Sequence, residues 1–141
     1  MTLELRVRSA ALVVCAFAAL ASLFIPWTES GSSARSAFAS VRAIEGAGLA
    51  GGFDQRVSLD AVFLVPAIAA IVCAATLVRR LAAAAIFGLL LGIVVVGFSV
   101  AALVELGGSA IGPAVGILTG GLTGVASVFV WLSGGAHVRS D

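Results

Sequence analysis

The residues from Leu81 to Leu103 read LAAAAIFGLLLGIVVVGFSVAAL and contain no charged side chain. A bilayer core of about 30 Å needs roughly 20 apolar residues in helical conformation, so this run is long enough to cross a membrane. Three further apolar runs occupy residues 10–27, 59–78 and 111–132. The sequence therefore predicts an all-α fold, a four-transmembrane-helix bundle that forms a single integral membrane domain over residues 1–141.

The overall composition agrees with lipid as the solvent. Of the 141 residues, 61% are hydrophobic and 11% are charged, and the mean hydropathy is +1.20. This leaves too little polar surface to cover a water-soluble domain. The net charge is +1, without the basic patch that a nucleic-acid-binding protein needs, so we expect no nucleic-acid partner.

The arginines set the expected orientation, because cytoplasmic flanks of membrane helices are enriched in positive charge. One side of the membrane would carry Arg6, Arg8, Arg79, Arg80 and Arg139, and the other Arg35, Arg42 and Arg56. We therefore expect a multi-pass protein of the inner (plasma) membrane with both termini in the cytoplasm. Arg79 and Arg80, in the short turn between the second and third spans, are expected to anchor that turn among the inner headgroups.

The first span could be mistaken for a secretory signal, since Arg6 and Arg8 precede its apolar core. The small-residue pattern at residues 37–39 lies too far beyond that core for cleavage to be expected. Pro26 and Trp27 are instead expected to end the span at the headgroup level.

Residues 28–58 form the one loop long enough to hold structure outside the bilayer. A polar turn is expected at 28–33. From Ala34 to Ala47 apolar residues recur at three- and four-residue steps, which predicts a short amphipathic helix capped by Ser32 or Ser33. The apolar face of that helix includes Phe38, Val41 and Ile44. This face either covers the bundle's own outer end or docks on the membrane interface or a partner.

The fourth span carries a regular glycine pattern, with glycines at four-residue steps. They are Gly108, Gly112, Gly116, Gly120 and Gly124. A helix face without side chains lets another helix approach closely, so the sequence predicts either a packing face inside the bundle or a groove for a partner. Thr119, Thr123 and Ser127 repeat the same step beside the glycines and are expected to donate hydrogen bonds across a helix pair. The third span has a shorter match in Ala84, Gly88 and Gly92.

Reactive residue types are few and scattered. Cys15 and Cys73 are expected at similar depth, as small apolar packing residues rather than a disulfide, and with His137 they make no metal set. Asp60 is expected to suit the positive end of the second span's helix dipole, ahead of any catalytic role. Glu105 is either a headgroup-level residue or a proton relay. We therefore predict no catalytic, cofactor-binding or metal-ligating residue, and no enzyme.

The stretch Phe24–Gly31, followed by Ala34–Phe38, resembles a pattern in small actinobacterial four-span membrane proteins. In those proteins a Pro-Trp pair ends the first helix, and a Ser-Gly, Arg-Ser, Phe series opens the outer loop. Proteins of this kind include accessory subunits of mammalian-cell-entry (MCE) lipid importers. The resemblance implies a helper of a transport complex and carries no catalytic or ligand residue over to this chain.

We therefore expect a non-enzymatic accessory subunit of a larger membrane complex, with an MCE-type lipid transporter as the leading context. Its partners would be the transporter's permease subunits and membrane lipids, and it would dock through its transmembrane helices and outer loop. One alternative is an accessory subunit of a respiratory or envelope-synthesis complex. Another is a small homo-oligomeric transporter, although four-span exporters carry an essential acid inside the first span and residues 10–27 have none.

Overall fold

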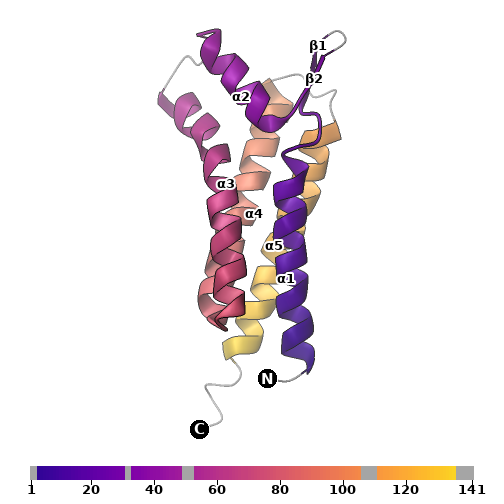
Figure 1. The fold of residues 1–141 in the computed structure, drawn as a ribbon, viewed down its shortest axis with the longest axis vertical. Coiled ribbons are helices and arrows are strands. Elements are labelled where there is room, and N and C mark those ends of the chain that lie inside the picture. The colour runs from indigo at the N-terminus through magenta and orange to yellow at the C-terminus, as the bar shows by residue number, and fades with distance from the viewer. Residues whose placement is uncertain (1–2, 31–32, 49–52, 106–110, 136–141) are drawn as a thin grey trace.

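The computed structural model describes residues 3–30, 33–48, 53–105 and 111–135. Four long helices run side by side (Figure 1). They are α1 (Leu3–Ser22), α3 (Phe53–Leu77), α4 (Leu81–Glu105) and α5 (Ile111–Gly135). Each is long and apolar enough to cross a membrane. The predicted all-α four-helix bundle is confirmed.

A small cap lies at one end of the bundle (Figure 1). It consists of strands β1 (Thr28–Ser30) and β2 (Ser33–Arg35), which pair as an antiparallel hairpin, and helix α2 (Ala37–Gly46). The start of α1, the end of α5 and the turn between α3 and α4 lie at the opposite end. The two described chain ends are thus on one side of the bundle, and its cytoplasmic identity stays a prediction.

The first helix differs from the expected span at both ends. It begins at Leu3 and ends at Ser22, well before Trp27. The backbone N–H groups of Leu23, Phe24 and Ile25 donate to carbonyls three residues earlier, at 3.0 to 3.3 Å, so the last turn tightens. Pro26 then prevents the helix from continuing, because the residue before a proline is pushed out of helical conformation.

The cap corrects two local predictions. Residues expected to form only a polar turn contribute to a β-hairpin, in which Thr28 pairs with Arg35. The amphipathic helix starts later than expected, and its N-cap is Ser36, whose side chain accepts a hydrogen bond from the backbone N–H of Ala39. The helix start is shifted because the second strand of the hairpin occupies residues that the apolar pattern had assigned to the helix.

Helix α3 begins at Phe53, about two turns before the predicted start of the second span. Asp60 therefore lies inside the helix with an exposed side chain, and the prediction that it occupies the first turn is wrong. Pro66 also lies within this helix, on its exposed side.

The turn between α3 and α4 is as short as the arginine pair suggested. The N–H of Arg80 donates to the carbonyl of Ala75 at 2.8 Å, and the N–H of Arg79 donates to that of Thr76 at 3.1 Å. This pair of bonds is the helix-ending arrangement that normally uses glycine at its left-handed position. Here Arg79 occupies that position with φ +59°, at a steric cost of about 1 kcal/mol. Both arginine side chains are exposed, as an anchoring role requires.

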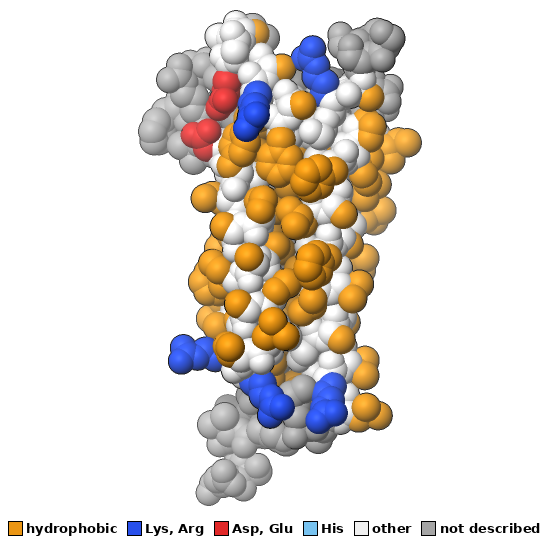
Figure 2. Space-filling view, viewed as in Figure 1, with side chains coloured by type: hydrophobic (Ala, Val, Ile, Leu, Met, Phe, Trp, Pro, Cys, Tyr) orange, Lys and Arg blue, Asp and Glu red, His pale blue; other side chains and the backbone are white. Residues whose placement is uncertain are grey.

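Packing centres on α4 and α5, which make the most extensive contact in the bundle; α3 packs on α4, and α1 packs on α5. The buried core is built from small and β-branched side chains, with Leu12, Leu23 and Leu91 its largest aliphatic members. Hydrophobic side chains also cover the long sides of the molecule, and the charged ones gather at its two ends (Figure 2). This distribution suits a protein surrounded by lipid.

Candidate functional site

Gly120 and Gly124 of α5 face Gly92 of α4 where the backbones of the two helices approach closely. A Cβ built on Gly92 of α4 would lie 2.7 Å from the carbonyl oxygen of Gly120 and 3.0 Å from the nitrogen of Gly124. A Cβ on Gly120 would in turn lie 3.1 Å from the carbonyl oxygen of Gly92. These neighbours are backbone atoms, so only glycine permits this spacing between the helices.

Glycine–serine pairs flank this central contact on both sides. Towards the cap, a Cβ on Gly116 would clash with the hydroxyl oxygen of Ser99. Towards the other end, a Cβ on Gly88 would clash with the hydroxyl oxygen of Ser127. In each pair one helix supplies the glycine and the other the serine, so the two faces are complementary. The sequence pattern found the glycines on both spans and placed Ser127 beside them, whereas Ser99 produced no signal.

The hydroxyl groups of α5 do not bridge to a second helix. Thr119 donates to the carbonyl of Val115 at 2.8 Å, Thr123 to that of Thr119 at 2.7 Å, and Ser127 to that of Thr123 at 2.7 Å. The prediction that these residues donate across a helix pair is therefore wrong. Their hydroxyls find an acceptor one turn back in their own helix, which requires no particular partner.

Trp27 closes the cap end of the glycine face. Its side chain is 2% exposed, and its indole N–H donates to the carbonyl of Ser22 at 2.8 Å. The ring packs on Phe98 with centroids 4.9 Å apart, and a Cβ on Gly112 would lie 2.5 Å from it. The ring of Trp27 is thus enclosed by its own chain, because the missing side chains of Gly112 and Gly116 leave room for it inside the bundle. Its depth at the headgroup level stays a prediction.

Backbone hydrogen bonds hold the tryptophan segment in place. The N–H of Gly112 donates to the carbonyl of Pro26 at 2.9 Å, which joins the start of α5 to this segment. The N–H of Trp27 donates to the carbonyl of Arg35 at 2.8 Å, and the N–H of Ala37 donates to that of Leu23 at 3.0 Å. The cap and the glycine face are therefore one connected structure.

The apolar face of α2 covers the bundle's own end. Val41 is fully buried, and Ile44 is partly buried. Phe38 lies between Phe24 and Phe63, with ring centroids 5.5 and 5.7 Å away. Of the two uses predicted for this face, the structure places it against its own chain.

At the opposite end, Arg8 links α1 to α5. Its guanidinium donates to the hydroxyl of Ser133 and lies 3.9 Å from the carboxylate of Glu4, one turn earlier. Both charged side chains are substantially exposed, so the ion pair contributes little by itself. No sequence pattern indicated this contact, because Arg8 and Ser133 are far apart along the chain.

The other reactive residues named in the sequence analysis form no cluster among the residues that the structure describes. Cys15 and Cys73 are free and half-buried. Over the described ranges there is no group of three metal-ligating side chains. The side chain of Glu105, together with Gly108, His137 and Arg139, lies outside the part of the chain that the structure describes.

Comparison with models of known protein families, with curated proteins and with solved structures finds no match. Function is therefore inferred from the residues of the chain themselves.

Proposed function

We propose that this protein is a non-enzymatic accessory subunit of a larger membrane complex, with an MCE-type lipid importer as the leading context. The observation that carries the proposal is the hydrogen bonding of the buried polar side chains. The buried polar side chains of the described residues are Ser9, Ser22, Ser40, Ser99, Thr123 and Ser127. Each donates its hydroxyl to a backbone carbonyl of its own helix or of that helix's N-cap residue.

Such an interior supports a structural role. Intramembrane transport and proton-relay pathways are marked by charged or unpaired polar groups that face the bundle's interior. Here each buried hydroxyl is satisfied by a nearby backbone carbonyl, and the central α4–α5 interface is a close packing contact between glycines. The hydroxyl donors of these side chains are therefore already satisfied within the fold.

The docking surface in this proposal is the outward face of α5, because the inward glycine face is occupied by α4 and Trp27. Exposed apolar residues follow one another there at alternating four- and three-residue steps, namely Leu118, Leu122, Val125, Phe129 and Leu132. This spacing presents one continuous ridge along a helix. Gly121 lies beside the ridge, and a Cβ added to it would meet no atom within 4 Å. A partner helix could approach closely at that point.

The MCE context rests on the resemblance of residues 24–38 to accessory subunits of those importers. In this chain the same segment contributes to the cap and to the buried tryptophan. A permease subunit is thus the proposed partner, which would contact the ridge within the membrane and the exposed Arg35, Arg42 and Glu45 of the cap outside it.

Purification of the tagged chain from its native membrane in mild detergent tests the proposal. We expect a defined set of larger membrane proteins to co-purify, and their identity separates a lipid importer from a respiratory or envelope-synthesis complex. Gly121→Leu should abolish co-purification without lowering the unfolding temperature of the isolated chain, because a side chain there meets no other atom. Gly97→Leu is the matched control, since Gly97 is also open but lies on α4.

A second variant separates docking from folding. Gly120→Leu places its side chain against Val96 and the backbone of Gly92, so it should lower the chain's own unfolding temperature. Recovery of the wild-type chain as a self-only oligomer that carries out proton-coupled flux in vesicles would contradict the proposal. It would favour the homo-oligomeric transporter instead.

A further inference from the structure

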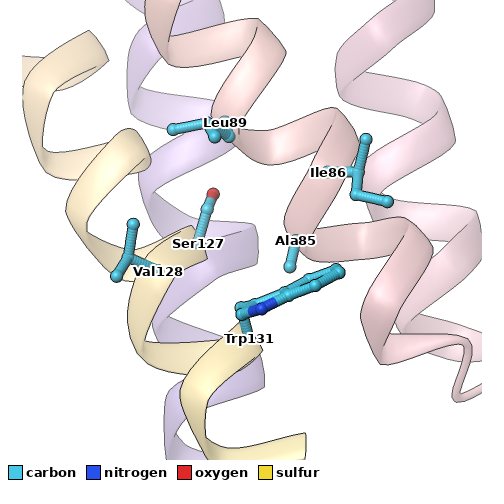
Figure 3. Close-up of a pocket in the computed structure, with 6 residues that line it drawn as sticks. All are labelled: Ala85, Ile86, Leu89, Ser127, Val128 and Trp131. Carbon is cyan, nitrogen blue, oxygen red and sulfur yellow. The ribbon is translucent and has the colours of Figure 1, made fainter. Parts of the chain in front are cut away.

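An apolar groove of about 250 Å³ opens between α4 and α5 on the lipid-facing side of the bundle. Its lining residues are Ala85, Ile86, Leu89, Ser127, Val128 and Trp131 (Figure 3). The ring of Trp131 extends from α5 towards Ala85 of α4 and forms one wall. The hydroxyl of Ser127 is satisfied within its own helix, so no lining group requires a polar ligand.

The groove lies at the depth of acyl chains in one leaflet. Ala85 and Leu89 follow Arg80 by five and nine residues along the chain, which places them about 7.5 and 13.5 Å from it along the helix axis. Trp131 lies in the last two turns of α5, at the same end. A partly exposed tryptophan there is typical of the boundary between headgroups and acyl chains.

The rim at this end is basic. Over the described side chains it carries Arg6, Arg8, Arg79 and Arg80, against the single acid Glu4. Figure 2 shows basic side chains gathered at this end. The two arginines of the α3–α4 turn are exposed and directly precede the first residue of α4. Arginine at headgroup level attracts anionic lipids.

The shape of the groove favours an acyl chain over a protein helix. Close approach of a partner helix in lipid is favoured by glycine on the approached face, as at Gly121 of the ridge. No glycine lines this groove, and Ile86, Leu89, Val128 and Trp131 project around it. An apolar cavity of about 150 Å³ already binds benzene, so the present volume is sufficient for part of a hydrocarbon chain.

We propose that this groove binds one acyl chain of an anionic phospholipid, whose phosphate lies beside the Arg79–Arg80 turn. None of the lining residues belongs to the outward ridge of α5, so the lipid site differs from the proposed docking surface. The protein would then bind one class of lipid at the surface of the bundle, beside the closely packed α4–α5 interface.

Tryptophan fluorescence tests the proposal directly, because Trp131 lines the groove while Trp27 is buried at the other end and gives an unquenched baseline. The protein is reconstituted in phosphatidylcholine vesicles that contain a small fraction of either phosphatidylglycerol or phosphatidylcholine with brominated acyl chains. We expect brominated phosphatidylglycerol to quench at lower mole fraction, by about fivefold for each arginine that contacts the headgroup. Equal quenching by the two lipids would overturn the proposal.

Two kinds of variant assign the contacts. Arg79→Gln with Arg80→Gln should remove the preference for phosphatidylglycerol while leaving quenching by brominated phosphatidylcholine in place. Val128→Phe fills the groove and should abolish the retention of phosphatidylglycerol in native mass spectra. Val100→Phe is the matched control, since Val100 is also an exposed valine but lies on α4 and does not line the groove.

Each alternative occupant has its own outcome. Retention of phosphatidylglycerol by Val128→Phe at the wild-type level would place the lipid elsewhere and refute the site. Chemical cross-linking of the chain into a dimer in vesicles, lost on Val128→Phe, would assign the groove to a second copy and also refute it.

Discussion

Replacing Gly92 by alanine should destabilise the bundle through a clash that no side-chain rearrangement can relieve. The new Cβ would lie 2.7 Å from the carbonyl oxygen of Gly120 and 3.2 Å from the Cα of Gly124, both backbone atoms of α5. Ordinary contact begins near 3.4 Å, so the helices must separate by about 0.7 Å at this point. Overpacking of this kind costs about 1–3 kcal/mol, and lipid offers no hydrophobic gain to offset the lost contacts.

Gly97→Ala provides the matched control on the same helix. A Cβ at Gly97 meets no atom within 4 Å, so this variant gains only the helix propensity of alanine, up to about 1 kcal/mol. Gly92→Ala gains the same propensity, and the difference between the variants therefore isolates the clash. Thermal unfolding in mild detergent should place Gly92→Ala several degrees below Gly97→Ala, at about 2–8 °C per kcal/mol. Equal unfolding temperatures would refute the close approach of α4 and α5.

Three further predictions concern orientation, the α3–α4 turn and the cap. In a cysteine-free background, a cysteine at Ser33 should react with a membrane-impermeant thiol reagent in intact spheroplasts and one at Ser140 should not; the reverse labelling would invert the topology. Arg79→Gly should raise the unfolding temperature, because glycine adopts the left-handed backbone at a saving of about 1 kcal/mol, whereas Arg80→Gly should not; equal effects would contradict the strain at Arg79. Trp27→Phe removes the buried N–H donor to the Ser22 carbonyl and should cost about 1–3 kcal/mol in thermal unfolding, more than Trp131→Phe at an exposed position.

Hydrophobic run length was sufficient to predict the four helices, because a membrane span must satisfy its backbone hydrogen bonds internally and needs a minimum apolar length. It was less informative about helix ends. The helix α1 starts within the charged residues before its apolar core, and α3 starts about two turns before its own. Helical hydrogen bonding continues into charged and polar residues outside the apolar run, so hydropathy marks the apolar part of the helix only.

The glycine steps of the fourth span identified a face without identifying its occupant. Removing side chains permits close approach whichever helix approaches, so Gly112, Gly116 and Gly120 fitted an internal contact and an external partner equally well. The complementary residues Ser99 and Trp27 decided between these uses. They come from other segments of the chain, and no local pattern connects them to the glycines.

The sequence by itself was sufficient to predict a lipid environment, four spans, the glycine face, and an amphipathic helix in the loop. Those properties follow from composition and periodicity, which act locally along the chain. The tertiary structure decided that the ring of Trp27 is enclosed by its own chain, that α2 covers its own bundle, and that an apolar groove opens beside Trp131. Each of these depends on which helices become neighbours, and in lipid that choice is made by the fit of side chains from distant segments rather than by hydrophobicity.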